Sequence, residues 1–279
     1  SLNLSIIFSG LSECINSNKT MPSPDIFFQR TISKLQMKTT YRDSIKSGLI
    51  VNNQKRNEDN LTIVFPPWGT SPLLLSWIVK AVSRNSSILG ISPSKMLTSD
   101  PEESLHFCTE SHQESLSLIK EELDSNDYEY IRVVGLSIGT GLAVLTSIDL
   151  LRGGYSVDRL DLVSPGSSMA SAFWSSKGTK ALKKAYLRQG YNLKSLEEVW
   201  SPVKIIDLID RLKDVPTKVT YSKADIIIRP SETKRLIAKL KRTGTPNLKV
   251  KKNYFLGHYL TLFWVWATWR IRYRSSEKI

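Results

Sequence analysis

The chain has few of the residues that build metal sites and disulfide scaffolds. Its 279 residues include two cysteines, Cys14 and Cys108, and three histidines. Two cysteines are too few for a disulfide scaffold, so we expect a reducing compartment and a cytoplasmic location. The cysteines and histidines form no cluster with zinc spacing, and the sequence contains no H-E-x-x-H motif. We therefore predict no metal site.

Long hydrophobic runs are also lacking, although 41% of the residues are hydrophobic. No apolar run reaches the roughly 18 residues of a membrane-spanning helix. Residues 1–8 lack the basic lead of a signal peptide, and the start at Ser1 leaves a removed export signal open. The length and apolar content are sufficient for one substantial hydrophobic core.

One segment, residues 131–141, combines a buried strand, a serine and closely spaced glycines. It reads I-R-V-V-G-L-S-I-G-T-G, with Gly135 and Gly139 flanking Ser137 at the G-x-S-x-G spacing. This spacing is typical of a sharp strand-to-helix turn, where the backbones pass too closely for side chains. The turn exposes the serine hydroxyl and aims the first N–H groups of the helix at the atom it attacks. Ser137 is therefore the candidate nucleophile.

A serine nucleophile needs a base to take its proton and a third group to orient that base. His258 follows Gly257 at the end of a strand expected near 248–256, and Asp225 follows a β-rich run at 217–221. We take these two residues as the base and the acid. The alternatives are a core histidine bonded to a backbone carbonyl and an aspartate that only forms a turn.

The order Ser137, Asp225, His258, each after a different strand, resembles that of the α/β-hydrolase superfamily. The resemblance covers residues from about 61 to 272 and rests on G-L-S-I-G at 135–139, the acid loop at 221–225 and the Gly257-His258 pair. It implies an α/β fold with a mostly parallel central sheet covered by helices on both faces. It also implies a Ser-His-Asp triad that works without a cofactor.

An oxyanion hole needs two backbone N–H groups aimed at the developing negative oxygen. Ile138, directly after the serine, is one expected donor. The other should follow the strand at 61–65, where the chain continues Pro66-Pro67-Trp68. Because proline has no N–H, Trp68 is the residue that matches the donor position of the family. The alternative is an ordinary proline-rich turn.

The pattern of strands and helices divides the chain into three parts. Strands expected at 61–65, 87–92, 130–135 and 159–164 alternate with helices near 71–84, 112–124 and 137–151, which predicts a parallel sheet. We therefore assign 61–164 and 216–279 to the hydrolase core. Residues 1–60, with a helix expected over 25–37, form a helical or irregular segment that packs on the core. Residues 165–215 contain no strand-like run and are expected to form a helical cap or lid.

The expected cap is rich in aromatic residues. Trp174, Tyr186 and Trp200 are candidates to line an acyl-binding pocket. The alternative is that they only fasten the cap helices to the core.

Charge is divided unevenly along the chain. Residues 1–176 contain 15 basic and 18 acidic residues, a net charge of −3, whereas residues 177–279 contain 24 and 8, a net charge of +16. Such asymmetry indicates an anionic partner, and we consider an anionic membrane surface, nucleic acid or an acidic substrate. Because no nucleic-acid-binding motif is present, we expect no specific nucleic-acid partner. The alternative is that the basic residues only confer solubility.

The C-terminal segment predicts a helix with two apolar stripes. One stripe, expected to face the sheet, comprises Leu260, Trp264, Ala267 and Ile271; the other comprises Leu262, Trp266, Trp269 and Tyr273. The second stripe requires cover from the N-terminal segment, a partner subunit or a membrane interface.

Taken with the resemblance, these residues predict a serine hydrolase that cleaves a small carboxylic ester, with a lipid-like acyl substrate as one candidate. Acyl transfer, thioester cleavage and peptide cleavage use the same triad and stay open. A non-catalytic hydrolase-fold protein that binds anionic surfaces through its basic part is the alternative from another class. The sequence leaves the oligomeric state open.

Overall fold

A computed structural model describes residues 49–54, 59–67, 70–82, 86–93, 97–176 and 178–275. All of these residues belong to the unit formed by Tyr41–Ile279. The helix expected over 25–37, the packing of residues 1–48 and the position of Trp68 lie outside the described residues.

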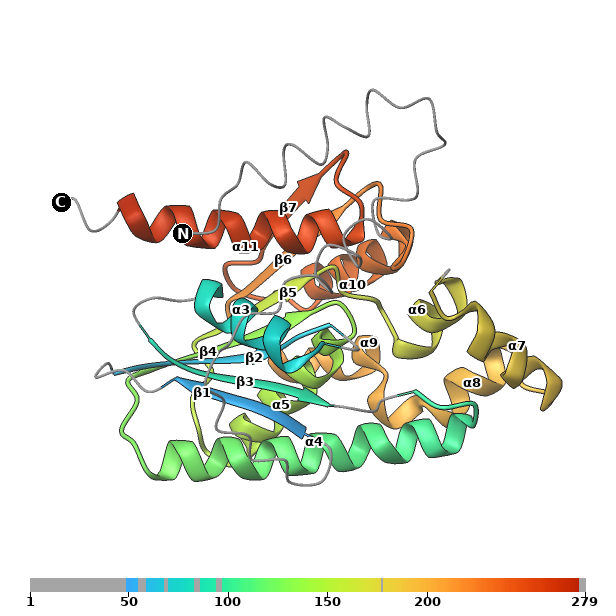
Figure 1. Cartoon of the computed structure of the whole chain (residues 1–279), viewed down its shortest axis with the longest axis horizontal. Helices are drawn as coiled ribbons and strands as arrows, with labels where there is room; N and C mark the ends of the chain where they lie inside the picture. Colours follow the sequence, from blue (N-terminus) through green and yellow to red (C-terminus); the bar gives the residue numbers. More distant parts are fainter. Residues whose placement is uncertain are drawn as a thin grey trace. The chain divides into compact units, whose positions relative to one another are not determined.

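The described residues form a sheet of seven strands (Figure 1). Its order is β1 (Leu49–Gln54), β3 (Ser87–Pro93), β2 (Asn60–Phe65), β4 (Tyr130–Leu136), β5 (Arg159–Val163), β6 (Thr217–Ser222) and β7 (Lys249–Asn253). Only β1 is antiparallel to its neighbour, and the other five pairings in this sheet are parallel. The predicted mostly parallel sheet is confirmed.

Helices cover both faces of this sheet. On one face, α3 (Pro72–Val82) and α11 (His258–Ser275) lie side by side, and on the other lie α4 (Pro101–Asp124), α5 (Gly139–Arg152) and α10 (Pro230–Arg242). Strand β4 shows the division directly. Ile131 and Val133 join the core under α4 and α5, whereas Val134 and Leu136 join the core under α3 and α11. Alternate residues of one strand are buried on opposite faces, as expected for a doubly covered sheet.

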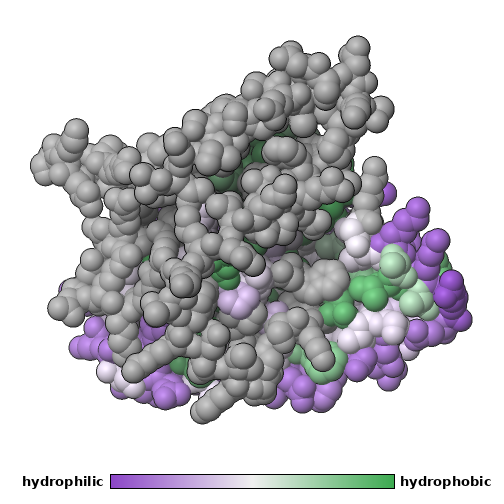
Figure 2. Space-filling view, in the orientation of Figure 1, coloured by the Kyte–Doolittle hydropathy of each residue, from purple (hydrophilic) through white to green (hydrophobic). Residues whose placement is uncertain are grey.

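Short helices fill the connection between β5 and β6. They are α6 (Met169–Ser175), α7 (Lys180–Arg188), α8 (Leu193–Val199), η1 (Ser201–Val203), α9 (Ile205–Leu208) and η2 (Ile209–Leu212). Residues 195–212 do not form one continuous helix, because α8 ends at Val199 and a new turn begins at Ser201, where Pro202 has no N–H to donate to a preceding carbonyl. In Figure 2, hydrophilic residues line the outer edge of the molecule along α4 and α7.

Two elements begin earlier than the sequence pattern indicated. Strand β1 lies within the segment expected to be helical or irregular, because Asn52 and Asn53 on this edge strand hide the apolar alternation. Helix α4 begins at Pro101, whereas the sequence pattern indicated a start near residue 112. The Asp100 carboxylate caps it by accepting the N–H groups of Glu102 and Glu103 at 2.8 and 3.3 Å.

The most buried positions of helix α11 are offset by one residue from the expected stripe, although Trp264 of that stripe also packs on the core, partly buried. Thr261 and Val265 are buried, whereas Leu260 is half-buried. These buried positions follow His258 at helical spacing, so the placement of His258 sets the rotation of the helix. The side chains of Trp266 and of residues 269–275 lie outside the described residues. No described helix is both long and apolar enough to cross a membrane.

The turn from β4 into α5 leaves no room for side chains on its two flanking glycines. A Cβ on Gly139 would lie 2.4 Å from the Phe65 carbonyl oxygen and 2.5 Å from that of Pro66. A Cβ on Gly135 would lie 2.6 Å from the Cα of Thr140. These contacts are with backbone atoms, so relief requires the helix to move away from the sheet.

We expect Gly139→Ala to destabilise the protein by about 1–3 kcal/mol, because the added methyl overpacks a backbone contact. Gly141→Ala is the matched control, since its Cβ would meet only the Ile205 side chain at 3.9 Å. Because alanine favours helix, the control should be neutral or stabilising by up to about 1 kcal/mol. Urea unfolding followed by circular dichroism measures both changes. Equal stability of the two variants would contradict this interpretation of the turn.

A buried ion pair joins Arg132 of β4 to Asp161 of β5 on one face of the sheet. The Asp161 carboxylate is 1% exposed and accepts hydrogen bonds from Arg132, at 2.9 Å from Nε, and from Arg159 Nε at 2.9 Å. Burial by itself raises the pKa of Asp161, but the charges of Arg132, Arg159 and Lys218 outweigh it and hold the pKa below its usual value. Asp161 therefore stays ionised at neutral pH.

We expect Asp161→Asn to destabilise the protein by about 3–5 kcal/mol at pH 7, because the buried Arg132 charge loses its partner. The control Asp207→Asn breaks an exposed pair with Lys204 and should cost less than about 1 kcal/mol. Since Asp161 has a lowered pKa, its contribution is complete above its unfolded pKa of about 3.9 and is lost as the pH falls through the folded value. Chemical unfolding at several pH values should therefore show the difference between wild type and variant shrinking only in acid. A difference that is unchanged below the folded pKa would refute the ionised pair.

Candidate active site

Ser137 occupies the strained turn between β4 and α5. Its backbone φ of +55° lies in the left-handed region that residues other than glycine rarely adopt. The Ser137 N–H donates to the Val163 carbonyl at 2.8 Å, and the Ser137 carbonyl accepts the Thr140 N–H at 3.0 Å. These bonds fix the backbone on both sides of the side chain.

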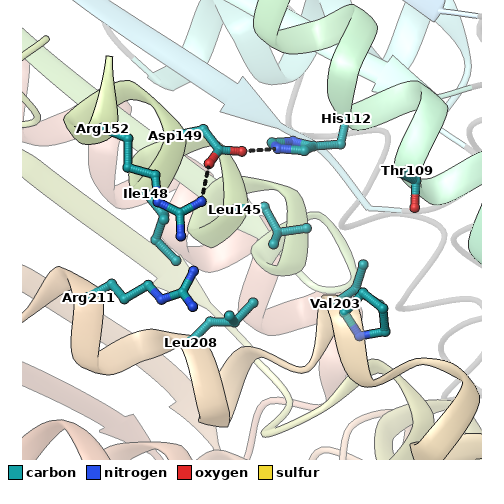
Figure 3. A pocket seen from close by; sticks show the side chains of 10 residues that line it. Thr109, His112, Leu145, Ile148, Asp149, Arg152, Val203, Leu208 and Arg211 are labelled. Atoms are coloured by element: carbon teal, nitrogen blue, oxygen red, sulfur yellow. Dashed lines mark hydrogen bonds and ion pairs between the residues drawn. The ribbon is translucent and has the colours of Figure 1, made fainter. Parts of the chain in front are cut away.

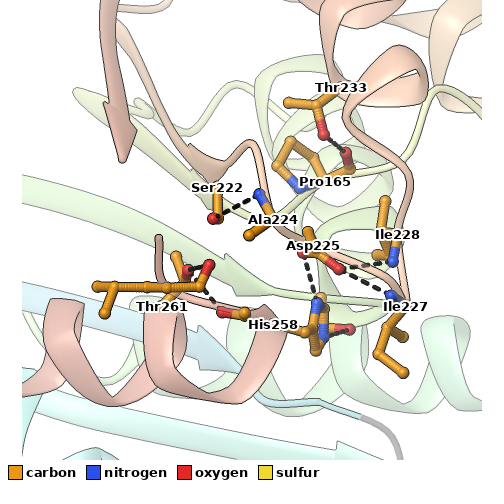
Figure 4. A network of polar contacts seen from close by, with 12 residues as sticks. Pro165, Ser222, Ala224, Asp225, Ile227, Ile228, Thr233, His258 and Thr261 are labelled. Atoms are coloured by element: carbon orange, nitrogen blue, oxygen red, sulfur yellow. Dashed lines mark hydrogen bonds and ion pairs between the residues drawn. The ribbon is translucent and has the colours of Figure 1, made fainter. Parts of the chain in front are cut away.

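Asp225 lies in the loop that follows β6, and its side chain is 3% exposed. Its Oδ1 accepts the N–H groups of Ile227 and Ile228 at 2.9 and 2.8 Å. This leaves Oδ2 to face His258 (Figure 4). The two backbone bonds hold the carboxylate in one orientation.

His258 is the first residue of α11 and connects the other two residues. Its Nδ1 lies 2.7 Å from Asp225 Oδ2, and its Nε2 lies 2.8 Å from Ser137 Oγ. In the tautomer with the hydrogen on Nδ1, that atom donates to Asp225 and Nε2 can accept the Ser137 hydroxyl proton. The structure thus brings the three residues selected from the sequence into one hydrogen-bonded chain.

The sheet topology explains why residues so distant in sequence meet. Ser137, Asp225 and His258 follow β4, β6 and β7, whose carboxyl ends lie at the same edge because these strands are parallel. The loops after β6 and β7 are also tied together directly, since the Lys223 N–H donates to the Asn253 carbonyl at 2.9 Å. That bond sets the acid loop beside the base loop.

The two expected oxyanion donors differ in what the structure describes. Ile138 is the N-cap residue of α5, so its backbone lies at the positive end of the helix dipole, directly after Ser137. Trp68 lies outside the described residues. The loop beside it is held by Thr70, whose Oγ1 donates to the Pro67 carbonyl at 2.5 Å.

The three aromatic residues considered for an acyl pocket occupy two different environments. Tyr186 and Trp200 are fully buried and pack on Phe173, with ring centroids 4.9 and 5.5 Å from it. The Tyr186 hydroxyl donates to the Thr98 carbonyl at 3.0 Å, and Trp200 Nε1 donates to the Pro101 carbonyl at 2.8 Å. These contacts fasten the insert to the start of α4.

Trp174 is half-buried, and Lys183 Nζ lies 4.5 Å from the centroid of its ring. Of the three aromatic residues, it is the one with accessible surface for another molecule.

Other reactive side chains lie away from Ser137 or are chemically quiet. His112 is paired with Asp149 at 2.9 Å beside a separate pocket between α4, α5 and the insert (Figure 3). His106 pairs with Glu110 on the exposed side of α4. Burial raises the pKa of Cys108 to about 12, so this thiol stays protonated. None of these residues competes for the role given to Ser137.

Sequence analysis missed one unusual residue, Ser164, at the end of β5. It has a φ of +51°, and its buried hydroxyl has no hydrogen-bond partner among the described residues. Its N–H donates to the Thr220 carbonyl at 2.7 Å. The sequence V-S-P-G at 163–166 contains no pattern that indicates this conformation.

Across the described residues, no group of three or more histidine, cysteine, aspartate or glutamate side chains is arranged to hold a metal ion.

The chain was compared with protein families, curated sequences and solved structures. Neither a scan against protein-family models nor a search of curated protein sequences gave a match. Solved structures do match. Carboxyl esterase 2 from Tuber melanosporum superposes with a TM-score of 0.56 and 13% identity, over 90% of this chain and 99% of that chain. Est1E from Butyrivibrio proteoclasticus gives 0.54 and 12%, over 81% and 93%.

The acylaminoacyl peptidase of Pyrococcus horikoshii is a third match, with a TM-score of 0.56 and 15% identity. It is matched over 82% of this chain, which spans only 38% of that longer protein. At identities of 12–15%, these three matches show a common fold and nothing about the substrate. The chain therefore has the α/β-hydrolase fold, as its sequence resemblance implied.

Proposed function

We propose that the protein is a serine hydrolase that cleaves a carboxylic ester through an acyl-enzyme intermediate. The observation that carries the proposal is the continuous hydrogen-bonded chain from Asp225 through His258 to Ser137. Two of the matched structures are esterases and one is a peptidase, which supports a hydrolase with this fold.

In the first step His258 Nε2 takes the Ser137 proton as Oγ attacks the carbonyl carbon of the ester. Asp225 holds Nδ1–H and stabilises the imidazolium that forms. Collapse of the tetrahedral intermediate expels the alcohol, which receives the proton from His258. Water, activated by His258 in the same way, then releases the acid and restores Ser137.

The negative oxygen of each tetrahedral intermediate needs two N–H donors. We assign the N–H groups of Ile138 and Trp68 to this task. Support comes from the place of Ile138 at the start of α5 and from the two prolines that precede Trp68 and have no N–H.

An acyltransferase, a thioesterase or a peptidase would use the same residues, and the acceptor or leaving group alone distinguishes them. We choose the ester because two of the matched structures are esterases. This chain is matched over 93% and 99% of their lengths. Trp174 is our candidate for contact with the acyl group, whereas the buried contacts of Tyr186 and Trp200 favour the fastening role.

We expect Ser137→Ala and His258→Ala each to lower kcat by about 10⁴–10⁶-fold, and the double variant by little more, because the residues act as one unit. Asp225→Asn should cost somewhat less. The assay is hydrolysis of a p-nitrophenyl ester series, together with labelling by a fluorophosphonate probe. His106→Ala and Asp207→Asn change exposed residues and serve as matched controls with wild-type turnover. Full turnover by Ser137→Ala would refute the triad.

A covalent phosphonate complex tests the oxyanion donors. We expect one phosphoryl oxygen to lie about 2.7–3.1 Å from the amide nitrogens of both Ile138 and Trp68, the range for oxyanion-hole bonds. A crystal structure of the labelled protein measures these distances. A phosphoryl oxygen without any contact from residues 66–70 would exclude Trp68 as a donor. The labelled complex is needed because such bonds often tighten only when the site is occupied.

A further inference from the structure

The two loops that carry Asp225 and His258 expose apolar and basic side chains next to the triad. On the acid loop, Ile226 is 48% exposed. On the base loop, Tyr254 is 53% and Phe255 92% exposed. An exposed phenylalanine beside other exposed apolar residues is unusual on a protein that meets only water, and such patches mark interaction sites.

Lysines from both loops surround these apolar residues. Lys223 Nζ and Lys252 Nζ each lie 4.6 Å from the centroid of the Tyr254 ring, one from each loop. The hydrogen bond from Lys252 and the two lysine charges lower the pKa of the Tyr254 hydroxyl. We call the five residues Lys223, Ile226, Lys252, Tyr254 and Phe255 the loop rim.

The segment that contains the loop rim has a large excess of basic over acidic residues. Residues 217–256 contain eleven lysines and arginines but only two acidic residues, Asp225 and Glu232. Asp225 is paired with His258, and Glu232 accepts hydrogen bonds from Ser167 and Ser171 and lies 3.6 Å from Arg235. Lys239 pairs with Asp210 of the insert, so neither Arg235 nor Lys239 is an unpaired charge. Eight of the basic residues are exposed: Lys223, Arg229, Lys234, Arg235, Lys241, Arg242, Lys249 and Lys252.

We propose that the loop rim docks on the surface of an anionic lipid bilayer. Lysines meet the negative headgroups, and the Ile226 and Phe255 side chains enter the apolar layer beneath them. Charge complementarity selects an anionic partner, and the exposed aliphatic and aromatic side chains at the same place select lipid over nucleic acid. Two copies of this chain would repel each other across such a rim.

Docking would bring the loops that carry Asp225 and His258 against the bilayer, so that an ester dissolved in the membrane would meet the protein beside Ser137. This consequence rests on the proposed function, whereas docking itself depends only on the loop rim.

Co-sedimentation with vesicles tests the proposal, using the full chain with Ser137→Ala so that binding is measured without hydrolysis. We expect binding to vesicles of phosphatidylcholine with about one-third phosphatidylglycerol, none to pure phosphatidylcholine, and weaker binding as salt rises from low to physiological levels. Equal binding to neutral and anionic vesicles, or no binding to either at low salt, overturns the proposal.

Matched substitutions locate the surface. Lys223→Gln with Lys252→Gln should weaken vesicle binding about 30-fold, since each basic residue near an anionic surface contributes roughly fivefold. Lys241→Gln with Arg242→Gln removes the same charge from the C-terminal end of α10 and should weaken it much less. Phe255→Ser should lower binding about tenfold or more, whereas Leu187→Ser, at a 50% exposed position in the insert, should have little effect. Equal losses in the rim and control variants overturn the assignment.

Two further measurements separate the alternatives. A single-stranded oligonucleotide that binds the rim while anionic vesicles do not would replace lipid by nucleic acid and overturn the proposal. Fluorophosphonate labelling of the wild-type protein reports on the triad independently of lipid. Labelling without vesicle binding refutes docking alone, whereas vesicle binding without labelling refutes the proposed function and leaves docking supported.

Discussion

The backbone contact between the start of α5 and the ends of β2 and β4 is the constraint on which the site depends. Gly139 lies against the carbonyls of Phe65 and Pro66, and Gly135 lies against Thr140, so the chain can turn only through Ser137. The turn costs Ser137 an unfavourable φ, which the hydrogen bond to Val163 and the packing of α5 offset. The same contact sets the N-terminus of α5 directly behind the serine hydroxyl.

The rest of the candidate site follows from adding neighbouring strands to that turn. Since β4, β5, β6 and β7 are parallel, each one ends at the same edge and delivers one loop there. The loop after β4 carries Ser137, the loop after β6 carries Asp225, and the loop after β7 leads to His258. The loop after β5 carries Ser164, with a similarly strained backbone and an unpartnered buried hydroxyl among the described residues. Four neighbouring strand ends therefore lie along one edge of the sheet.

Much of this arrangement could be predicted from sequence because it depends on local patterns. Apolar runs located the central strands, and the G-x-S-x-G spacing located the turn. What failed depends on contacts between distant segments. Strand β1 is polar at Asn52 and Asn53 and is recognisable only beside β3. The rotation of α11 follows from His258 bonding to Asp225, which no helical pattern within residues 260–273 reveals.

The effect of a charged residue likewise depends on its position in the fold, which composition does not reveal. Net charge treats Arg132 and Lys223 alike, yet Arg132 is buried and pairs β4 with Asp161 of β5, whereas Lys223 is exposed on the loop that carries Asp225. The Arg132 charge affects the stability of the fold, because burial removes its hydration and leaves it dependent on its pairing with Asp161. Exposure leaves the second charge able to act on whatever approaches the site. Of the positive charge counted over residues 177–279, the proposed docking therefore uses the basic side chains on the loops that also expose Ile226 and Phe255, at the edge of the sheet where Ser137, Asp225 and His258 lie.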